Sequence, residues 1–211
     1  MSNFFRSIKY HWKRTLAIFF LGLAVAFEIA YFIIGMVQML QSGSYSVNTF
    51  SFIWNFAILM ICYVTMLLGN LRNSYSAYRG VLSFVFLSTI LLIFDVIYDL
   101  FDLGFASSVT ALGIEIGIIA AMVGEIVLGV FCYLRLQGYL TGRYVNLRRL
   151  KLLFGLFLGF LIISNGLYIG LVFYELGLAI STLTIFLLLL SPISELFAAV
   201  GTWVTIARLD E

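Results

Sequence analysis

The chain has 211 residues, of which 63% are hydrophobic and 10% charged, and its mean hydropathy is +1.11. This composition excludes a soluble globular domain, and no polar stretch is long enough to fold separately. We therefore predict a single integral membrane domain over residues 1–211. The formal net charge of +2 gives no indication of a nucleic-acid partner.

Six apolar runs are each long enough to cross about 30 Å of hydrocarbon. In chain order these runs cover residues 16–40, 50–69, 81–103, 108–134, 152–173 and 178–206. Inside a bilayer the backbone must satisfy its own hydrogen bonds, so spans of this length are helices. The first run is too long for a signal-peptide core and is interpreted as a retained helix. The predicted fold is an all-α, polytopic membrane bundle of six transmembrane helices.

The basic residues fall on one side of this map. All 12 Lys and Arg residues precede the first span, lie in the 70–80 and 135–151 connections, or follow the last span. We therefore predict an integral protein of the cell membrane, and the positive-inside rule predicts that both termini are cytoplasmic. A basic face of this kind attracts anionic lipid headgroups, and membrane orientation explains it without nucleic-acid binding.

A weaker pattern suggests internal repeats. The sequences "EIAY" (28–31), "DVIY" (95–98) and "NGLY" (165–168) begin 67 and 70 residues apart, and Glu125 and Glu195 are also 70 apart. Three two-helix hairpins would produce this period. The alternative is that hairpins with short loops recur near this length by chance.

Acidic residues gather at one predicted depth. At about 1.5 Å per residue, four carboxylates and one amide lie about 14–21 Å from the basic ends of their spans, near the bilayer midplane. These residues are Glu28, Asp95, Glu125, Asn165 and Glu195. A second layer lies farther from the basic ends and is interpreted as an acidic entrance, formed by Asp99, Asp102, Glu115 and Glu175. Small and polar residues follow the same helix faces, so the acids are predicted to face inward.

No Lys, Arg or His lies within any span. Each charged carboxylate at the bilayer centre costs about 2.5–3.5 kcal/mol on the insertion scale. Four such groups cannot all stay ionised without a compensating positive charge. The sequence therefore predicts that protons, a metal ion or a cationic substrate bind among them. No cofactor is evident beyond such a bound cation, and the identity of any metal is undetermined.

The only proline of the chain, Pro192, lies in the last span between Ser191 and Ser194. Proline removes one helical hydrogen bond and frees the carbonyl of residue 188. That carbonyl, with Ser191, Ser194 and Glu195, offers the oxygen ligands that hard cations prefer. The alternative is structural: a protonated Glu195 bonds a neighbouring helix while the serines satisfy the groups that proline frees.

Two functions are compatible with these sequence features. The acidic interior favours a small cation- or proton-linked transporter or permease. The small size and the basic segment 135–151 favour a non-catalytic subunit that assembles with a larger complex, through a cytoplasmic or membrane partner. Residues 139–151 are also expected to lie along the membrane surface as an amphipathic segment. No motif of an intramembrane enzyme is present, so we expect no catalytic residues.

Overall fold

The computed structural model describes residues 2–42, 47–72, 75–102, 108–176 and 182–209. These residues form α1 (Ser2–Ser42), α2 (Val47–Leu71), α3 (Ser76–Asp102), α4 (Val109–Leu140), α5 (Leu147–Leu176) and α6 (Thr182–Ile206). Each of the six helices contains an apolar stretch long enough to cross a membrane. The predicted all-α bundle with six potential transmembrane helices is thus confirmed.

The helices extend beyond the predicted spans, most of all in the basic regions. α1 begins at Ser2 and α4 continues to Leu140, so only residues 141–146 connect α4 to α5. The turn contains Gly142 at φ +80°, a left-handed conformation that glycine adopts without strain. The Asn146 side chain accepts a hydrogen bond from the Arg149 backbone N–H and caps α5. The expectation that 139–151 forms a separate surface segment is therefore wrong: the two helices use most of it.

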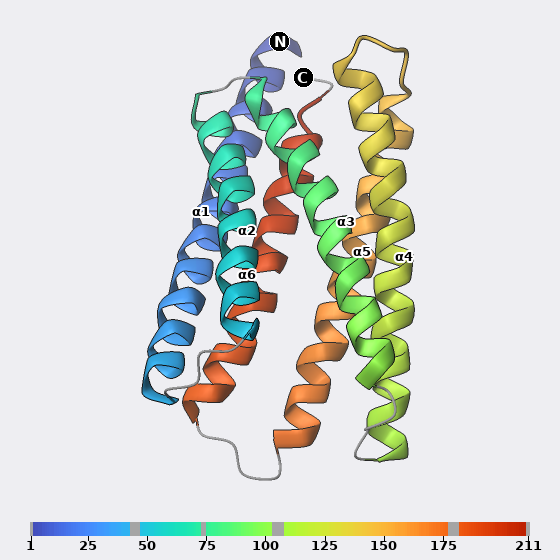
Figure 1. Ribbon diagram of the computed structural model, residues 1–211. Coiled ribbons are helices and arrows are strands. Elements are labelled where there is room, and N and C mark those ends of the chain that lie inside the picture. The colour runs from blue at the N-terminus through green and yellow to red at the C-terminus, as the bar shows by residue number, and fades with distance from the viewer. Residues whose placement is uncertain (1, 43–46, 73–74, 103–107, 177–181, 210–211) are drawn as a thin grey trace.

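The helices form a ring in chain order. Each helix packs against the next, and α6 closes the ring by packing along α1 (Figure 1). Both ends of the chain lie at the same end of the bundle, and the 141–146 turn lies there too. The basic chain regions therefore meet at one end, as the distribution of Lys and Arg predicts.

Packing continues around the whole ring, since α2 packs along α3 and α5 along α6 (Figure 1). Near the termini α2 and α3 approach closely, and a Cβ on Gly69 would come within 2.4 Å of the Ala77 backbone nitrogen. Glycine is required at this position because any side chain would strike backbone.

The half of the bundle nearest the termini is filled with apolar side chains. The fully buried members include Leu21, Tyr63, Met66, Leu136, Phe154 and Ile206. Polar groups close the same end. The Lys13 and Lys151 amino groups donate to the Ala207 carbonyl oxygen at 3.2 and 3.0 Å, and the Arg14 Nε donates to the Asn70 carbonyl oxygen at 2.8 Å. Basic side chains thus cap the carbonyl ends of α2 and α6.

Candidate functional site

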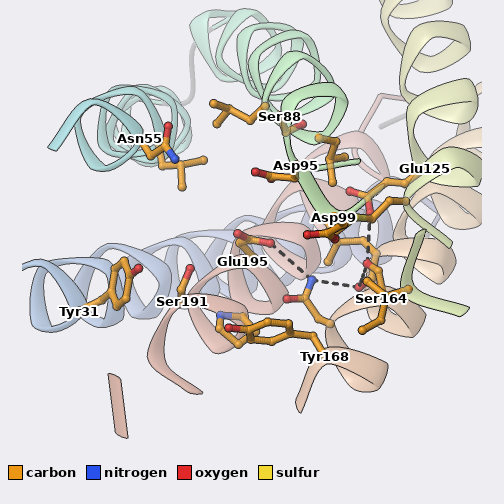
Figure 2. Close-up of a pocket in the computed structure, with 18 of the residues that line it drawn as sticks. Tyr31, Asn55, Ser88, Asp95, Asp99, Glu125, Ser164, Tyr168, Ser191 and Glu195 are labelled. Atoms are coloured by element: carbon orange, nitrogen blue, oxygen red, sulfur yellow. Dashed lines mark hydrogen bonds between the residues drawn. The ribbon is translucent and has the colours of Figure 1, made fainter. Parts of the chain in front are cut away.

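A cavity of about 630 Å³ lies inside the ring, and all six helices contribute to its lining (Figure 2). Its lining residues come from the middle of the helices and from the half farther from the termini, for example Asn55 near the start of α2 and Glu115 near the start of α4. The polar lining residues are Glu28, Tyr31, Asn55, Ser88, Asp95, Asp99, Glu115, Glu125, Ser164, Asn165, Tyr168, Ser191 and Glu195. The cavity therefore begins where the apolar core ends.

The structure brings together most residues of the predicted cation site. Six of the seven line the cavity, namely Glu28, Asp95, Glu125, Asn165, Ser191 and Glu195. Of the predicted entrance, Asp99 and Glu115 also line it. Asp102 and Glu175 lie outside the residues whose side chains the structure describes. The predicted convergence of the buried acids on a common interior is thus observed.

Ser194 has a different position from the one predicted. It is fully buried, and its hydroxyl donates to the Ala24 carbonyl oxygen of α1 at 3.1 Å. It joins α6 to α1 behind the cavity wall, which is the structural role of a serine near a membrane proline. α6 remains helical through Pro192, and Pro192 itself lines the cavity.

Two hydrogen bonds connect carboxyls of the cavity to α5. Ser164 Oγ lies 3.3 Å from Glu125 Oε2 and 3.0 Å from the Leu161 carbonyl oxygen, so its one proton is shared between two acceptors. Asn165 Nδ2 donates to Glu195 Oε2 at 3.4 Å and to the Leu161 carbonyl oxygen at 3.0 Å (Figure 2). Adjacent residues of one helix thus orient carboxyls on α4 and on α6.

Glu28 is the most enclosed of these acids. Its side chain is 1% exposed, and among the described residues its Oε2 atom has no hydrogen-bond partner. Its carboxyl also approaches the Ser194 hydroxyl, which in turn approaches the buried Tyr63 hydroxyl. A buried carboxyl oxygen without a partner is costly, because it has lost water without replacing it. The group therefore has capacity for a positively charged or proton-donating ligand.

Asp95 on α3 lies in a different environment. Its side chain is exposed although it lines the cavity, whereas Glu28 and Glu125 are buried. The carboxyls therefore differ in exposure around the cavity: that of Asp95 on α3 is accessible, whereas those of Glu28 on α1 and Glu125 on α4 are enclosed.

The acids do not form a metal centre in the part of the chain that the structure describes. No three His, Cys, Asp or Glu side chains there come close enough together to hold one metal ion. The carboxyls surround the cavity from α1, α3, α4 and α6 instead of converging on a point. This arrangement spreads negative charge over the wall of a space large enough for a small molecule.

Rings from α1 and α2 form one wall of the cavity, here called the aromatic wall and composed of Tyr31, Phe52 and Phe56. Phe32 packs behind it, with ring centroids 4.0 Å from Phe56 and 5.7 Å from Phe52. A Cβ on Gly35 would come within 2.4 Å of the Phe52 ring, so the missing side chain at Gly35 admits that ring.

Sequence reasoning missed Asn55, Ser88 and Ser164. A signal for Asn55 existed: extending the 70-residue spacing of Glu125 and Glu195 back once more gives 125 − 70 = 55. Each helix then supplies an acid or amide to the cavity, with Asn55 on α2. The tyrosines of the suggested repeat do not behave alike, because Tyr31 and Tyr168 line the cavity while Tyr98 is 67% exposed, so the repeat stays a prediction.

Comparisons of the chain with protein families, with curated protein sequences and with solved structures find no match. The class is therefore defined by the structure alone. Six apolar helices of membrane-spanning length define a multi-pass membrane protein. Its distinguishing feature is a carboxylate-lined cavity within the ring of helices.

Proposed function

We propose that this protein is a cation- or proton-linked transporter whose binding site is the carboxylate-lined cavity. One observation carries the proposal: acids from four helices line the cavity, and no Lys, Arg or His is among its lining residues. Isolated charges of this kind are expensive in a membrane and are associated with ion and proton pathways. Bound cations or protons would neutralise them.

The two halves of the bundle support the proposal. Apolar packing and capped helix ends close the half nearest the termini, while the cavity occupies the middle and the other half. Access from one side at a time is what a transporter requires, and its site typically lies near the midplane between structural units. The cavity is lined by all six helices of the ring.

The proposed orientation has both termini in the cytoplasm of the cell, because the basic chain regions lie at that end. The cavity would then be reached from outside, and anionic lipids would surround the basic end. Reporters fused to either end test this orientation. Activity of a cytoplasm-specific reporter at both ends is expected, and periplasmic or extracellular activity at either end would reverse the proposed topology.

A second candidate function is an assembly subunit without transport activity. It is favoured by the exposed side chains of Arg143, Tyr144, Arg148 and Arg149, which project at the α4–α5 turn. Reversing the charge of Arg148 and Arg149 should release a co-purifying partner if this function is correct. Unchanged co-purification, or purification without a partner, would count against it.

The decisive experiment combines thermal unfolding in detergent with uptake by reconstituted vesicles, across protons and a panel of monovalent, divalent and organic cations. We expect one class of cation to raise the unfolding temperature in a saturable way and to be taken up. Glu125→Gln with Glu195→Gln should abolish both effects without unfolding the protein, since glutamine keeps the shape and a hydrogen-bonding amide. Glu211→Gln, the same chemical change outside the spans, is the matched control. No response to any cation or to pH would refute transport by this cavity.

A further inference from the structure

We propose that the ligand of the cavity is an organic ammonium ion with an apolar body. Its charge lies beside Glu28, and its body lies against the aromatic wall of Tyr31, Phe52 and Phe56. This inference rests on the proposed function, which leaves the class of cation open.

The dimensions of the cavity favour an organic ion over an inorganic one. A bare metal ion needs several oxygen ligands within about 2.0–2.6 Å of one point. Among the described residues no group of three acidic, histidine or cysteine side chains offers that convergence. The cavity volume of about 630 Å³ falls within the range of small-molecule sites. The carboxyls are too far apart to coordinate one compact ion together. A larger ligand with a single charge needs only one of them beside that charge.

Glu28 is the best-placed partner for the charge. Its Oε2 atom is buried and has no hydrogen-bond partner within the described ranges, whereas Glu125 and Glu195 already accept hydrogen bonds from α5. An ammonium group beside Glu28 would restore the interaction that burial removes. Ser194 lies near this carboxyl but outside the cavity lining, and its hydroxyl donates to the Ala24 carbonyl oxygen.

The aromatic wall adjoins that carboxyl along the chain. Tyr31 is three residues after Glu28 and therefore lies on the same face of α1. Its ring packs edge-on to Phe52 at 5.1 Å between centroids, and Phe56 follows one turn along α2. The faces of such rings attract alkylated ammonium ions, most strongly where water is excluded. A carboxylate next to three rings is thus suited to a cation that carries hydrocarbon.

The test is a comparison of probes on the purified full chain, by thermal unfolding and by calorimetric titration. Benzyltrimethylammonium and tetramethylammonium serve as organic probes, and Na⁺, K⁺ and Ca²⁺ as inorganic ones. We expect saturable binding of benzyltrimethylammonium, weaker binding of tetramethylammonium, and no saturable effect of the inorganic ions. Glu28→Gln should weaken benzyltrimethylammonium binding at least about tenfold, whereas Glu211→Gln should leave it unchanged.

Phe56→Leu is the second variant, because it keeps an apolar side chain and removes the ring. It should weaken benzyltrimethylammonium several-fold and tetramethylammonium less, with helix content and elution volume unchanged. Saturable binding and uptake of inorganic ions alone would overturn this inference while preserving the proposed transport function. Tight organic binding that is insensitive to both variants would overturn the assigned position. If the original protein responds to none of these cations, the inference and the proposed function are both overturned.

Discussion

The side-chain amide of Asn165 on α5 donates a hydrogen bond to the Glu195 carboxyl on α6, with 3.4 Å between Nδ2 and Oε2. The bond joins two neighbouring helices of the ring at the wall of the cavity (Figure 2). Asn165 also bonds back to its own helix through the Leu161 carbonyl. Because that second bond already orders the Asn165 side chain, the contact with Glu195 costs little further side-chain entropy.

Asn165→Ala should lower the free energy of unfolding by about 0.6–1.7 kcal/mol, the range measured for hydrogen bonds between membrane helices. Unfolding in mixed micelles measures this loss. Because the proposed role of the bond is specific, the loss should shrink to near zero when Glu195 is already alanine. Equal losses in both backgrounds would show that Asn165 acts through other contacts.

Close packing near the termini can be tested with two glycines. Gly69→Ala places a methyl group against the backbone of Ala77, so we expect a loss of about 1–3 kcal/mol from overpacking. Gly22→Ala is the matched control, since nothing lies within 4 Å of its Cβ position. Higher helix propensity should leave that variant unchanged or stabilised by up to about 1 kcal/mol. Equal stability of the two variants would contradict the contact between α2 and α3.

Asn70 organises the buried polar cluster at the same end. Its Nδ2 donates to the Met66 carbonyl oxygen at 2.9 Å and to Thr205 Oγ1 at 3.1 Å, and its Oδ1 accepts from the buried Arg208 guanidinium. Asn70→Leu should cost about 1.5–3 kcal/mol, because a hydrogen bond to a charged group is lost. Thermal unfolding measures the effect, and a variant as stable as the original protein would show that the cluster contributes little.

Access to the cavity is predicted to be one-sided. The two native cysteines, Cys62 and Cys132, are buried and unbridged, so replacing both with alanine provides a background for labelling. In that background a membrane-impermeant thiol reagent added outside intact cells should label Asp99→Cys and spare Ala199→Cys, which is fully buried in the apolar half. Labelling of Asp99→Cys only from the cytoplasmic side would invert the orientation.

Acid should weaken cation binding, because protons and cations compete for the same carboxyls. If one proton leaves for each cation bound, the affinity falls up to about tenfold for each unit of decreasing pH. The groups that take part are the carboxyls that line the cavity, namely Glu28, Asp95, Asp99, Glu115, Glu125 and Glu195. Titration between pH 5 and 8 measures the slope, and an affinity independent of pH would exclude competition.

Much of the fold could be predicted from the sequence, because the thickness of the bilayer sets the length of an apolar helix that crosses it. Span length fixed the number of helices, and the distribution of Arg and Lys fixed which ends lie together. The depth of Glu28, Asp95 and Glu125 followed from the rise of a helix. To predict that these residues surround one cavity, the order of the helices in the ring must also be known. The periodicity within each helix does not reveal that order.

The remaining differences have local causes. Ser194 and Ser191 are three residues apart and look equivalent in the sequence, but the close approach of α1 gives Ser194 a carbonyl partner at Ala24 and leaves Ser191 on the cavity. Asn55 was overlooked because its helix contains no acid that would draw attention to its depth. Residues 139–151 were expected to lie along the membrane surface because they are basic and amphipathic, but basic residues are equally suited to the ends of two long helices.

The closure of the ring by α6 has a consequence for biogenesis. Helices enter the membrane in order of synthesis, and a chain that ends after α5 has no partner for the inner face of α1. Glu28 would then face lipid or another protein, because α6 is the helix that packs along α1 and bonds to it through Ser194 and the Ala24 carbonyl. The nascent chain therefore contains an exposed intramembrane acid until its last helix arrives. A chaperone or insertase that shields such groups would be needed longest for this protein at that stage.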